Sequence, residues 1–151
     1  PRSITSMRIR MEVIDLGLGD KVSIQDKTDY QGVVRDLQDA DVFITASGRD
    51  GTPVSLLEAM SSGLPCIATA VGGVPEWIAD DDNGLLIPPE NPEILCEKML
   101  LLAGNREKRN SLGTRARRTI LERGDWNTLM QQAESDYFAL IDTNGKTGNR
   151  T

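Results

Sequence analysis

The chain has 151 residues, enough for one compact domain with a hydrophobic core, and its 38% hydrophobic and 26% charged residues are ordinary for a globular protein. A formal net charge of −6 argues against a broad nucleic-acid surface, which needs a basic excess. The absence of histidine excludes Ser-His and Cys-His catalysis. The two cysteines, Cys66 and Cys96, are more typical of buried thiols than of a disulfide or a metal site.

The sequence contains no membrane-length apolar stretch and no signal-peptide pattern, so we expect a cytoplasmic protein. Its first residue is Pro1 rather than Met, and we expect the chain to be a piece of a longer protein. The expected organisation is a partial domain over residues 1–141, followed by a polar tail, 142–151, that we predict to be disordered.

Hydrophobic spacing predicts helices alternating with strands over the first part of the chain. Helices are predicted over 7–16, 30–39, 53–62 and 74–78, and strands over 21–25, 41–46, 65–69 and 85–87. This alternation is typical of an α/β fold, with a Rossmann-like parallel sheet flanked by helices. The rest of the chain is predicted to be helical, with Asn91, Asn105 and Asp125 as three N-caps and Pro92 at a first helical position.

Ligands of such sheets bind beyond the carboxyl ends of the strands, so loops 47–52 and 70–75 are the expected site. Residues 46–63 read ASGRDGTPVSLLEAMSSG. Thr52 is the predicted N-cap of a helix that begins at Pro53 and stops at Gly63. The free amides at this helix start, those of Val54, Ser55 and Leu56, then form an anion site that suits a diphosphate.

Two carboxylates flank these amides. Glu58 lies roughly 7–8 Å along the helix from Pro53 and could accept hydrogen bonds from the two hydroxyls of a ribose. Asp50, in the loop, could accept them from a sugar attached to the diphosphate. The alternative interpretation makes Asp50 a turn residue and Glu58 part of a solvated helix face, and the spacing alone leaves both open.

Two glycines follow the predicted strand 65–69. Gly72 and Gly73 could let the backbone approach a ligand, or they could form the turn that starts the next helix. We expect the turn first and a wall of the donor site second.

Residues 47–63, followed by PCIATAVGGVPEWIADDDNGLLIPPENPEIL, resemble the donor domain of family 4 glycosyltransferases, which are retaining enzymes of the GT-B fold. The shared pattern is an acidic residue, a Gly-x-Pro loop, LLEAM, a strand, GG-x-PE-x-I and G-x-L-x-P. LGLGDKVSI and ADVFITAS are similar to the strand-helix-strand that precedes it, so the resemblance spans roughly residues 16–141. It implies that this chain is the C-terminal lobe of a two-domain enzyme.

The resemblance also assigns roles. Asp50 and Glu58 fall on the family's two acidic site positions, the first contacting the transferred sugar and the second the ribose hydroxyls. The loop under the donor sugar falls on Gly51, Thr52 and Pro53, and the amides that hold the diphosphate fall on Val54, Ser55 and Leu56. The strand over 22–25, with Ile24, corresponds to the backbone edge that contacts the base.

Two departures from the family pattern stand out. Asp50 occupies a position where the family usually has Glu, which shortens the reach of the carboxylate by about one methylene. The first strand-helix unit of the donor domain and the whole acceptor domain have no counterpart here. We therefore expect the chain to be truncated at its amino end and inactive alone.

The resemblance implies transfer of a sugar from UDP or GDP to an acceptor hydroxyl, with retention and without an essential metal or cofactor, in polysaccharide, lipopolysaccharide or glycolipid synthesis. A sugar or lipid-linked acceptor would bind a missing N-terminal domain, and the whole enzyme could contact a membrane peripherally. The alternatives are a non-catalytic nucleotide-sugar-binding or regulatory module and a GT-B-like epimerase. A dinucleotide oxidoreductase would need a G-x-G-x-x-G turn, which this sequence lacks.

Two charge runs have simpler interpretations. Residues 80–82, all Asp, precede Asn83-Gly84 and predict an exposed turn rather than a metal-binding motif. Arg115, Arg117 and Arg118 predict an exposed helical face rather than a membrane-binding surface.

Overall fold

The computed structural model describes residues 4–25, 28–124 and 126–145. The chain divides into two compact units, Pro1–Asp36 and Leu37–Thr151. The first unit contains α1 (Ile4–Asp15) and most of α2 (Tyr30–Asp39), so both predicted helices are confirmed. Gly17 ends α1 with a φ of 65°, a left-handed conformation that glycine adopts without strain. The Leu18 amide then donates to the carbonyl of Val13 at 2.9 Å and closes the end of the helix.

The strand predicted over 21–25 is wrong. Residue 21 belongs to a turn, and residues 22–25 form neither helix nor strand. A strand needs a neighbour for its peptide groups, and the described residues pair none with this segment. The carbonyl of Ile24 instead accepts a hydrogen bond from the Arg10 guanidinium at 3.0 Å.

Three parallel strands form the sheet of the second unit, in the order β1 (Phe43–Thr45), β2 (Cys66–Thr69) and β3 (Leu85–Ile87). The register places Ile44 beside Ile67 and Ile67 beside Leu85. Three of the four predicted strands are therefore confirmed, although β1 is shorter than the expected 41–46. The predicted α/β fold with a parallel sheet is also confirmed.

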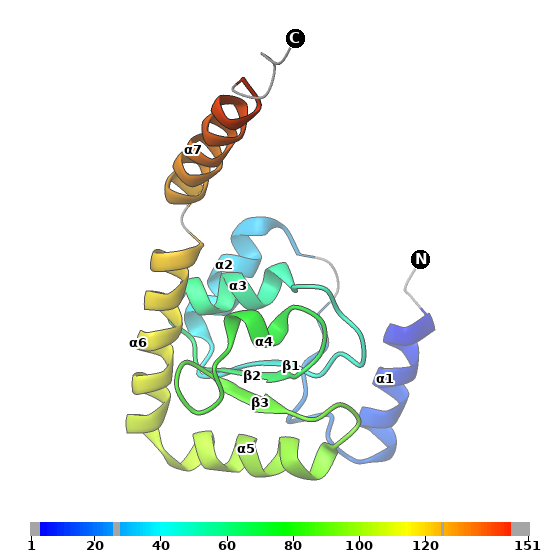
Figure 1. Cartoon of the computed structure of the whole chain (residues 1–151). Helices are drawn as coiled ribbons and strands as arrows, with labels where there is room; N and C mark the ends of the chain where they lie inside the picture. The colour runs from blue at the N-terminus through cyan, green and yellow to red at the C-terminus, as the bar shows by residue number, and fades with distance from the viewer. Residues whose placement is uncertain (1–3, 26–27, 125, 146–151) are drawn as a thin grey trace. The chain divides into compact units, whose positions relative to one another are not determined.

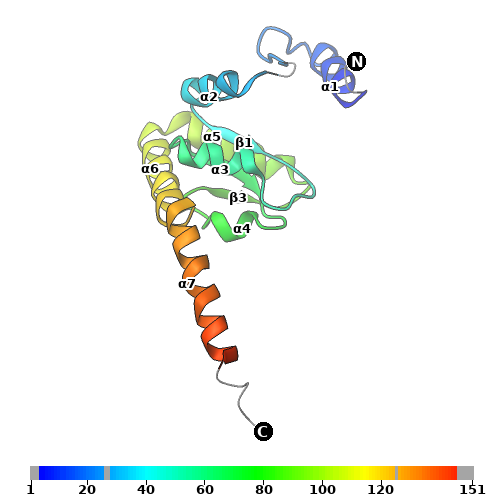
Figure 2. The same cartoon turned by 90° about the horizontal axis from the view of Figure 1, so that it is seen from above.

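Helices cover both faces of this sheet (Figure 1). α3 (Val54–Ser61) and α4 (Val74–Trp77) pack on the face that presents Cys66 and Ala68, while α5 (Pro92–Gly104) packs on the opposite face against Ile67 and Ile87. α6 (Arg106–Arg123) runs beside α3 (Figure 2) and contributes Ala116 to one core cluster and Leu112 to the other. The alternation of residues along β2 thus divides the core into two layers.

Two of the predicted helix caps are confirmed. The side chain of Asn91 accepts a hydrogen bond from the Ile94 amide at 3.0 Å at the start of α5, with Pro92 at the first helical position. Asn105 accepts from the Lys108 amide at 2.9 Å at the start of α6. The third predicted cap, Asp125, and the last six residues of the predicted tail, 146–151, lie outside the described residues. The last helix, α7 (Trp126–Gly145), extends beyond residue 141, so residues 142–145 of the predicted tail are helical.

The two thiols differ strongly in environment. Cys66 is completely buried and Cys96 is exposed, and both are free. Burial raises the pKa of the Cys66 thiol from its usual 9.0 to about 12, because the thiolate loses its hydration. A raised folded-state pKa stabilises the fold below pH 9.0, and this contribution is lost as the pH rises toward about 12.

We therefore expect a disulfide reagent near pH 8, at which unperturbed thiols react readily, to label the native chain in two phases. Cys96 should react quickly, and Cys66 should react only at the rate of unfolding. A Cys96→Ser variant should retain the slow phase alone and lose it when urea is added. Fast labelling of both thiols in the folded protein would contradict the burial of Cys66.

Candidate functional site

The loop from β1 leads into α3 one residue later than the sequence indicated. Pro53 is the N-cap, with extended backbone at φ −65° and ψ 122°, and Val54 begins the helix. No side chain caps this helix start, so the prediction that Thr52 is the N-cap and Pro53 the first helical residue is wrong. The positive ψ of Pro53 is the cause, because it keeps that residue outside the helical region.

The start of α3 presents two amides to solvent rather than three. The Leu56 amide donates to the Pro53 carbonyl at 3.0 Å, so the expectation that it is free is wrong. Within the described ranges, the amides of Val54 and Ser55 have no hydrogen-bond partner. The Val54 residue is 69% exposed, Ser55 is also exposed, and the first turn carries no acidic side chain. Two donors at the positive end of the helix therefore face solvent.

The C-terminal end of α3 is capped by a glycine. Gly63 has a φ of 79°, its amide donates to Met60 and the Leu64 amide donates to Ala59, at 3.0 and 3.1 Å. This pair of bonds confirms Gly63 as the predicted helix stop. Leu56, Ala59 and Met60 are fully buried, so packing holds one side of α3 against the core.

Both predicted carboxylates lack a cationic partner in the described part of the chain. Glu58 is half-buried, and it is the main-chain carbonyl of this residue that accepts from the hydroxyls of Ser61 and Ser62, at 2.7 and 2.9 Å. Asp50 is exposed in the loop. The carboxylates of Asp50 and Glu58 have no ion pair and no hydrogen bond among these residues, so both groups are available to a ligand.

The structure brings the two predicted loops together at the carboxyl end of the sheet. The Gly73 amide donates to the Gly51 carbonyl at 2.7 Å. Gly72 has a φ of 54° and lies against the backbone of Asp50. The backbone that closely approaches the glycine pair is thus that of the loop containing Asp50. The sequence did not indicate this contact between the two loops.

The Asp run forms the exposed turn that the sequence predicted. Asp80 accepts from the Leu86 amide at 2.9 Å, Asp81 pairs with Lys108 at 2.5 Å and Asp82 pairs with Arg115 at 2.7 Å. The hydrogen bond from Lys108 lowers the pKa of the Asp81 carboxyl. Each carboxylate therefore already has a protein partner, and among the described residues no group of three His, Cys, Asp or Glu could hold a metal ion.

The basic run on α6 also makes contacts within the second unit. Arg115 pairs with Asp82, Arg117 donates to the Ser61 carbonyl and Arg118 lies 3.8 Å from Glu122. Arg117 thereby ties α6 to the end of α3. No helix in the described part of the chain has the length and hydrophobicity required to span a bilayer.

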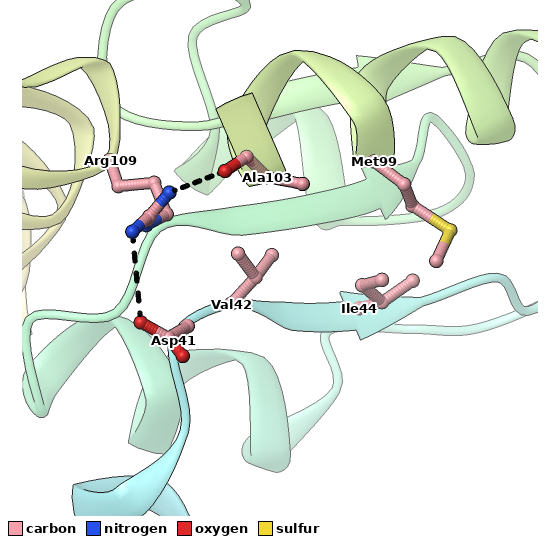
Figure 3. A pocket seen from close by; sticks show the side chains of 6 residues that line it. All are labelled: Asp41, Val42, Ile44, Met99, Ala103 and Arg109. Atoms are coloured by element: carbon pink, nitrogen blue, oxygen red, sulfur yellow. Dashed lines mark hydrogen bonds and ion pairs between the residues drawn. The ribbon is translucent and has the colours of Figure 1, made fainter. Parts of the chain in front are cut away.

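A groove of about 370 Å³ lies elsewhere, on the α5 face of β1 (Figure 3). Apolar side chains from β1 and α5 line it, and Arg109 lies 3.8 Å from Asp41 at one end. Figure 3 shows Ile44 and Met99 facing each other across the groove. The groove includes none of the predicted donor contacts, and its apolar lining does not suit a diphosphate.

The parallel sheet with helices on both faces matches the C-terminal domains of GT-B glycosyltransferases. Residues 7–119 match the family described as Glycosyl transferases group 1. The chain belongs to this family.

Among curated relatives, N-acetyl-alpha-D-glucosaminyl L-malate synthase of Bacillus anthracis is 32% identical over 136 residues, which are 89% of this chain and 35% of the synthase. Among solved structures, sucrose-phosphate synthase of Thermosynechococcus elongatus has a TM-score of 0.82 at 26% identity, covering 91% of this chain and 34% of that one. A variant of S. aureus TarM, solved with fondaparinux, alpha-GlcNAc-glycerol and UDP, has a TM-score of 0.77 at 25% identity, covering 85% and 26%. The chain thus spans about a third of the length of such relatives.

Proposed function

We propose that this chain binds a nucleoside diphosphate sugar as the donor side of a retaining, family 4 type glycosyltransferase. The observation that carries the proposal is the exposed start of α3, where the amides of Val54 and Ser55 have no hydrogen-bond partner among the described residues, in a segment that also holds two carboxylates without cationic partners. Membership of the group 1 family and the UDP bound to TarM support a nucleotide-sugar ligand.

The helix start suits the diphosphate. Two amides can each donate a hydrogen bond, and the partial positive charge of the helix end adds attraction in a chain whose net charge is −6. The absence of an acidic side chain from the first turn leaves that attraction uncompensated. Gly51, Thr52 and Pro53 would lie beneath the sugar, and no metal ion is required in this arrangement.

The carboxylates suit the hydroxylated ends of the donor. Like charge prevents them from holding a phosphate, whereas a carboxylate accepts strong hydrogen bonds from hydroxyl groups. Glu58, about 7.5 Å along α3 from Pro53, would bind the ribose, and Asp50 would bind the transferred sugar.

Chemistry would follow from this placement. The bond from the anomeric carbon to the diphosphate breaks, a bond to the acceptor oxygen forms on the same face, and the departing phosphate oxygen takes the proton of the acceptor hydroxyl. The α3 amides would stabilise the leaving diphosphate, Asp50 would hold the transferred sugar in position, and Glu58 would anchor the ribose. The acceptor, a sugar or a lipid-linked sugar of a polysaccharide or glycolipid pathway, would bind a domain outside these 151 residues, so this chain alone would catalyse no transfer.

A second candidate is a nucleotide-sugar-binding module without catalysis, which the shorter side chain of Asp50 favours. It would bind the donor equally well but would show no turnover in a longer polypeptide that includes an acceptor-binding domain. Turnover by that polypeptide would select the transferase.

The test is an NMR titration of the isotope-labelled chain with UDP-, GDP- and ADP-glucose. We expect saturable shifts of the Val54 and Ser55 amide signals with one of the three, and smaller shifts at distant helices such as α5. The same titration with glucose alone provides the control and should leave both signals unchanged. If no nucleotide sugar shifts these amides at millimolar concentration while the spectrum remains that of a folded protein, the proposal is wrong.

A further inference from the structure

The loop that carries Asp50 has little support of its own. Residues 48–52 are exposed and belong to no helix or strand. In the described part of the chain, its one backbone hydrogen bond to another segment is that from the Gly73 amide to the Gly51 carbonyl, at 2.7 Å. The position of Asp50 therefore depends on what holds Gly51.

The turn that holds Gly51 is firmly anchored. The Val71 amide donates to the Thr69 carbonyl at 2.8 Å at the end of β2, and the Val74 amide donates to Val71 at 3.1 Å. Val74, the first residue of α4, and Ile78, its C-cap, are buried. The Arg123 guanidinium lies 5.2 Å from the centre of the Trp77 ring and so ties α4 to α6. The turn is therefore held by β2, α4 and α6, whereas the loop is held by the turn.

The fit between turn and loop requires two glycines. A β-carbon on Gly72 would overlap the carbonyl oxygen of Asp50 and lie 2.8 Å from that of Gly51, and the φ of 54° disfavours any side chain. A β-carbon on Gly73 would overlap the hydroxyl oxygen of Thr52, and it would lie 3.3 Å from the carbonyl oxygen of Gly51 and 3.5 Å from the β-carbon of Thr52. The overlap at Gly72 is thus with backbone, whereas the overlap at Gly73 is with one removable side-chain atom, beside a tight contact with the Gly51 carbonyl.

We propose that Gly72 and Gly73 are positioning residues that hold the Asp50–Thr52 loop in place and so set where Asp50 meets the sugar of the donor. This inference rests on the proposed function for its ligand, but not for the loop contact itself. The glycine pair would act through Asp50 and would not touch the nucleotide.

The loop contact can be tested without a ligand. In the unaltered chain, we expect a scalar coupling across the hydrogen bond between the Gly73 nitrogen and the Gly51 carbonyl carbon, and slow exchange of the Gly73 amide. Gly73→Ala should weaken the hydrogen bond to Gly51 and shift the signals of residues 48–52. Exchange of the residue 73 amide should then be roughly tenfold faster or more, and a factor of ten corresponds to about 1.4 kcal/mol. Absence of both the coupling and slow exchange in the unaltered chain would overturn the inference.

A double-mutant cycle separates this contact from general damage. Gly73→Ala should displace the loop when Thr52 is present and have a clearly smaller effect in a Thr52→Ala background, where the overlapping hydroxyl is gone and the 3.3 Å contact with the Gly51 carbonyl remains. Gly72→Ala should displace the loop in both backgrounds, because it meets backbone. Gly104→Ala, at the end of α5 with no atom within 4 Å of the added carbon, is the matched control. Equal effects of Gly73→Ala in both backgrounds would overturn the inference.

The ligand arm uses UDP and UDP-glucose as probes. Gly73→Ala should reduce the preference for UDP-glucose over UDP roughly tenfold while leaving the UDP affinity unchanged, because Asp50 serves only the sugar. A displaced loop with an unchanged preference would overturn the role assigned to Asp50. If the unaltered chain binds neither probe nor any other nucleotide sugar, the proposed function fails, and the exchange and cycle measurements still decide the loop contact.

Discussion

Replacing Glu58 with Ala should weaken the binding of the nucleotide by about 1–3 kcal/mol, or roughly 5- to 150-fold in Kd. The physical reason is the loss of charge-assisted hydrogen bonds from the two ribose hydroxyls to a half-buried carboxylate without a protein cation among the described residues. Isothermal titration of the variant and the unaltered chain with UDP measures this effect directly. Glu97→Ala, an exposed acid on α5, is the matched control and should bind UDP normally.

The choice of ligand separates the role of Glu58 from that of the helix amides. Inorganic pyrophosphate lacks the ribose, so Glu58→Ala should bind it as well as the unaltered chain does. Asp50→Ala should keep its affinity for UDP and lose affinity for the sugar nucleotide. An unchanged UDP affinity in Glu58→Ala would remove Glu58 from the site, whereas equal losses for UDP and pyrophosphate would indicate damage to α3.

Replacing Asn83 with Ala should lower the free energy of unfolding by about 2–4 kcal/mol, because it removes three hydrogen bonds that a buried side chain makes to partly buried groups. Asn83 is 4% exposed. Its Oδ1 accepts from the Ala79 amide at 2.8 Å, and its Nδ2 donates to the Trp77 carbonyl and the Thr119 hydroxyl, both at 2.9 Å. The side chain thus joins the end of α4, the Asp turn and α6.

Urea denaturation followed by circular dichroism measures this loss. Asn110→Ala, at an exposed position on α6, is the matched control and should cost nothing. Thr119→Val removes one of the three bonds and should cost about 1 kcal/mol. A loss below about 0.5 kcal/mol for Asn83→Ala, the range of ordinary surface changes, would show that water replaces these bonds at little cost.

Local patterns in the sequence were sufficient to predict most of the elements. Hydrophobic spacing placed α2 and β3 at their observed bounds, and short-range chemistry placed the caps at Asn91 and Asn105 and the stop at Gly63. These features depend on residues within about one helical turn of each other, so the sequence carries them directly. The same is true of the start of α3, which the sequence located to within one residue.

Contacts between distant residues decided the rest. The segment 21–25 has the composition of a strand but no neighbour to pair with in the described residues. The Leu56 amide, by contrast, was missed for a local reason: Pro53 stands outside the helix, and its carbonyl accepts from that amide. Asn83 looked like a turn residue, yet it is a buried junction because Thr119 and Trp77 reach it. The sequence by itself determined which residues stand at the strand ends. Only the tertiary structure decided that Gly73 holds Gly51, because that bond joins two loops whose meeting depends on the packing of the whole sheet.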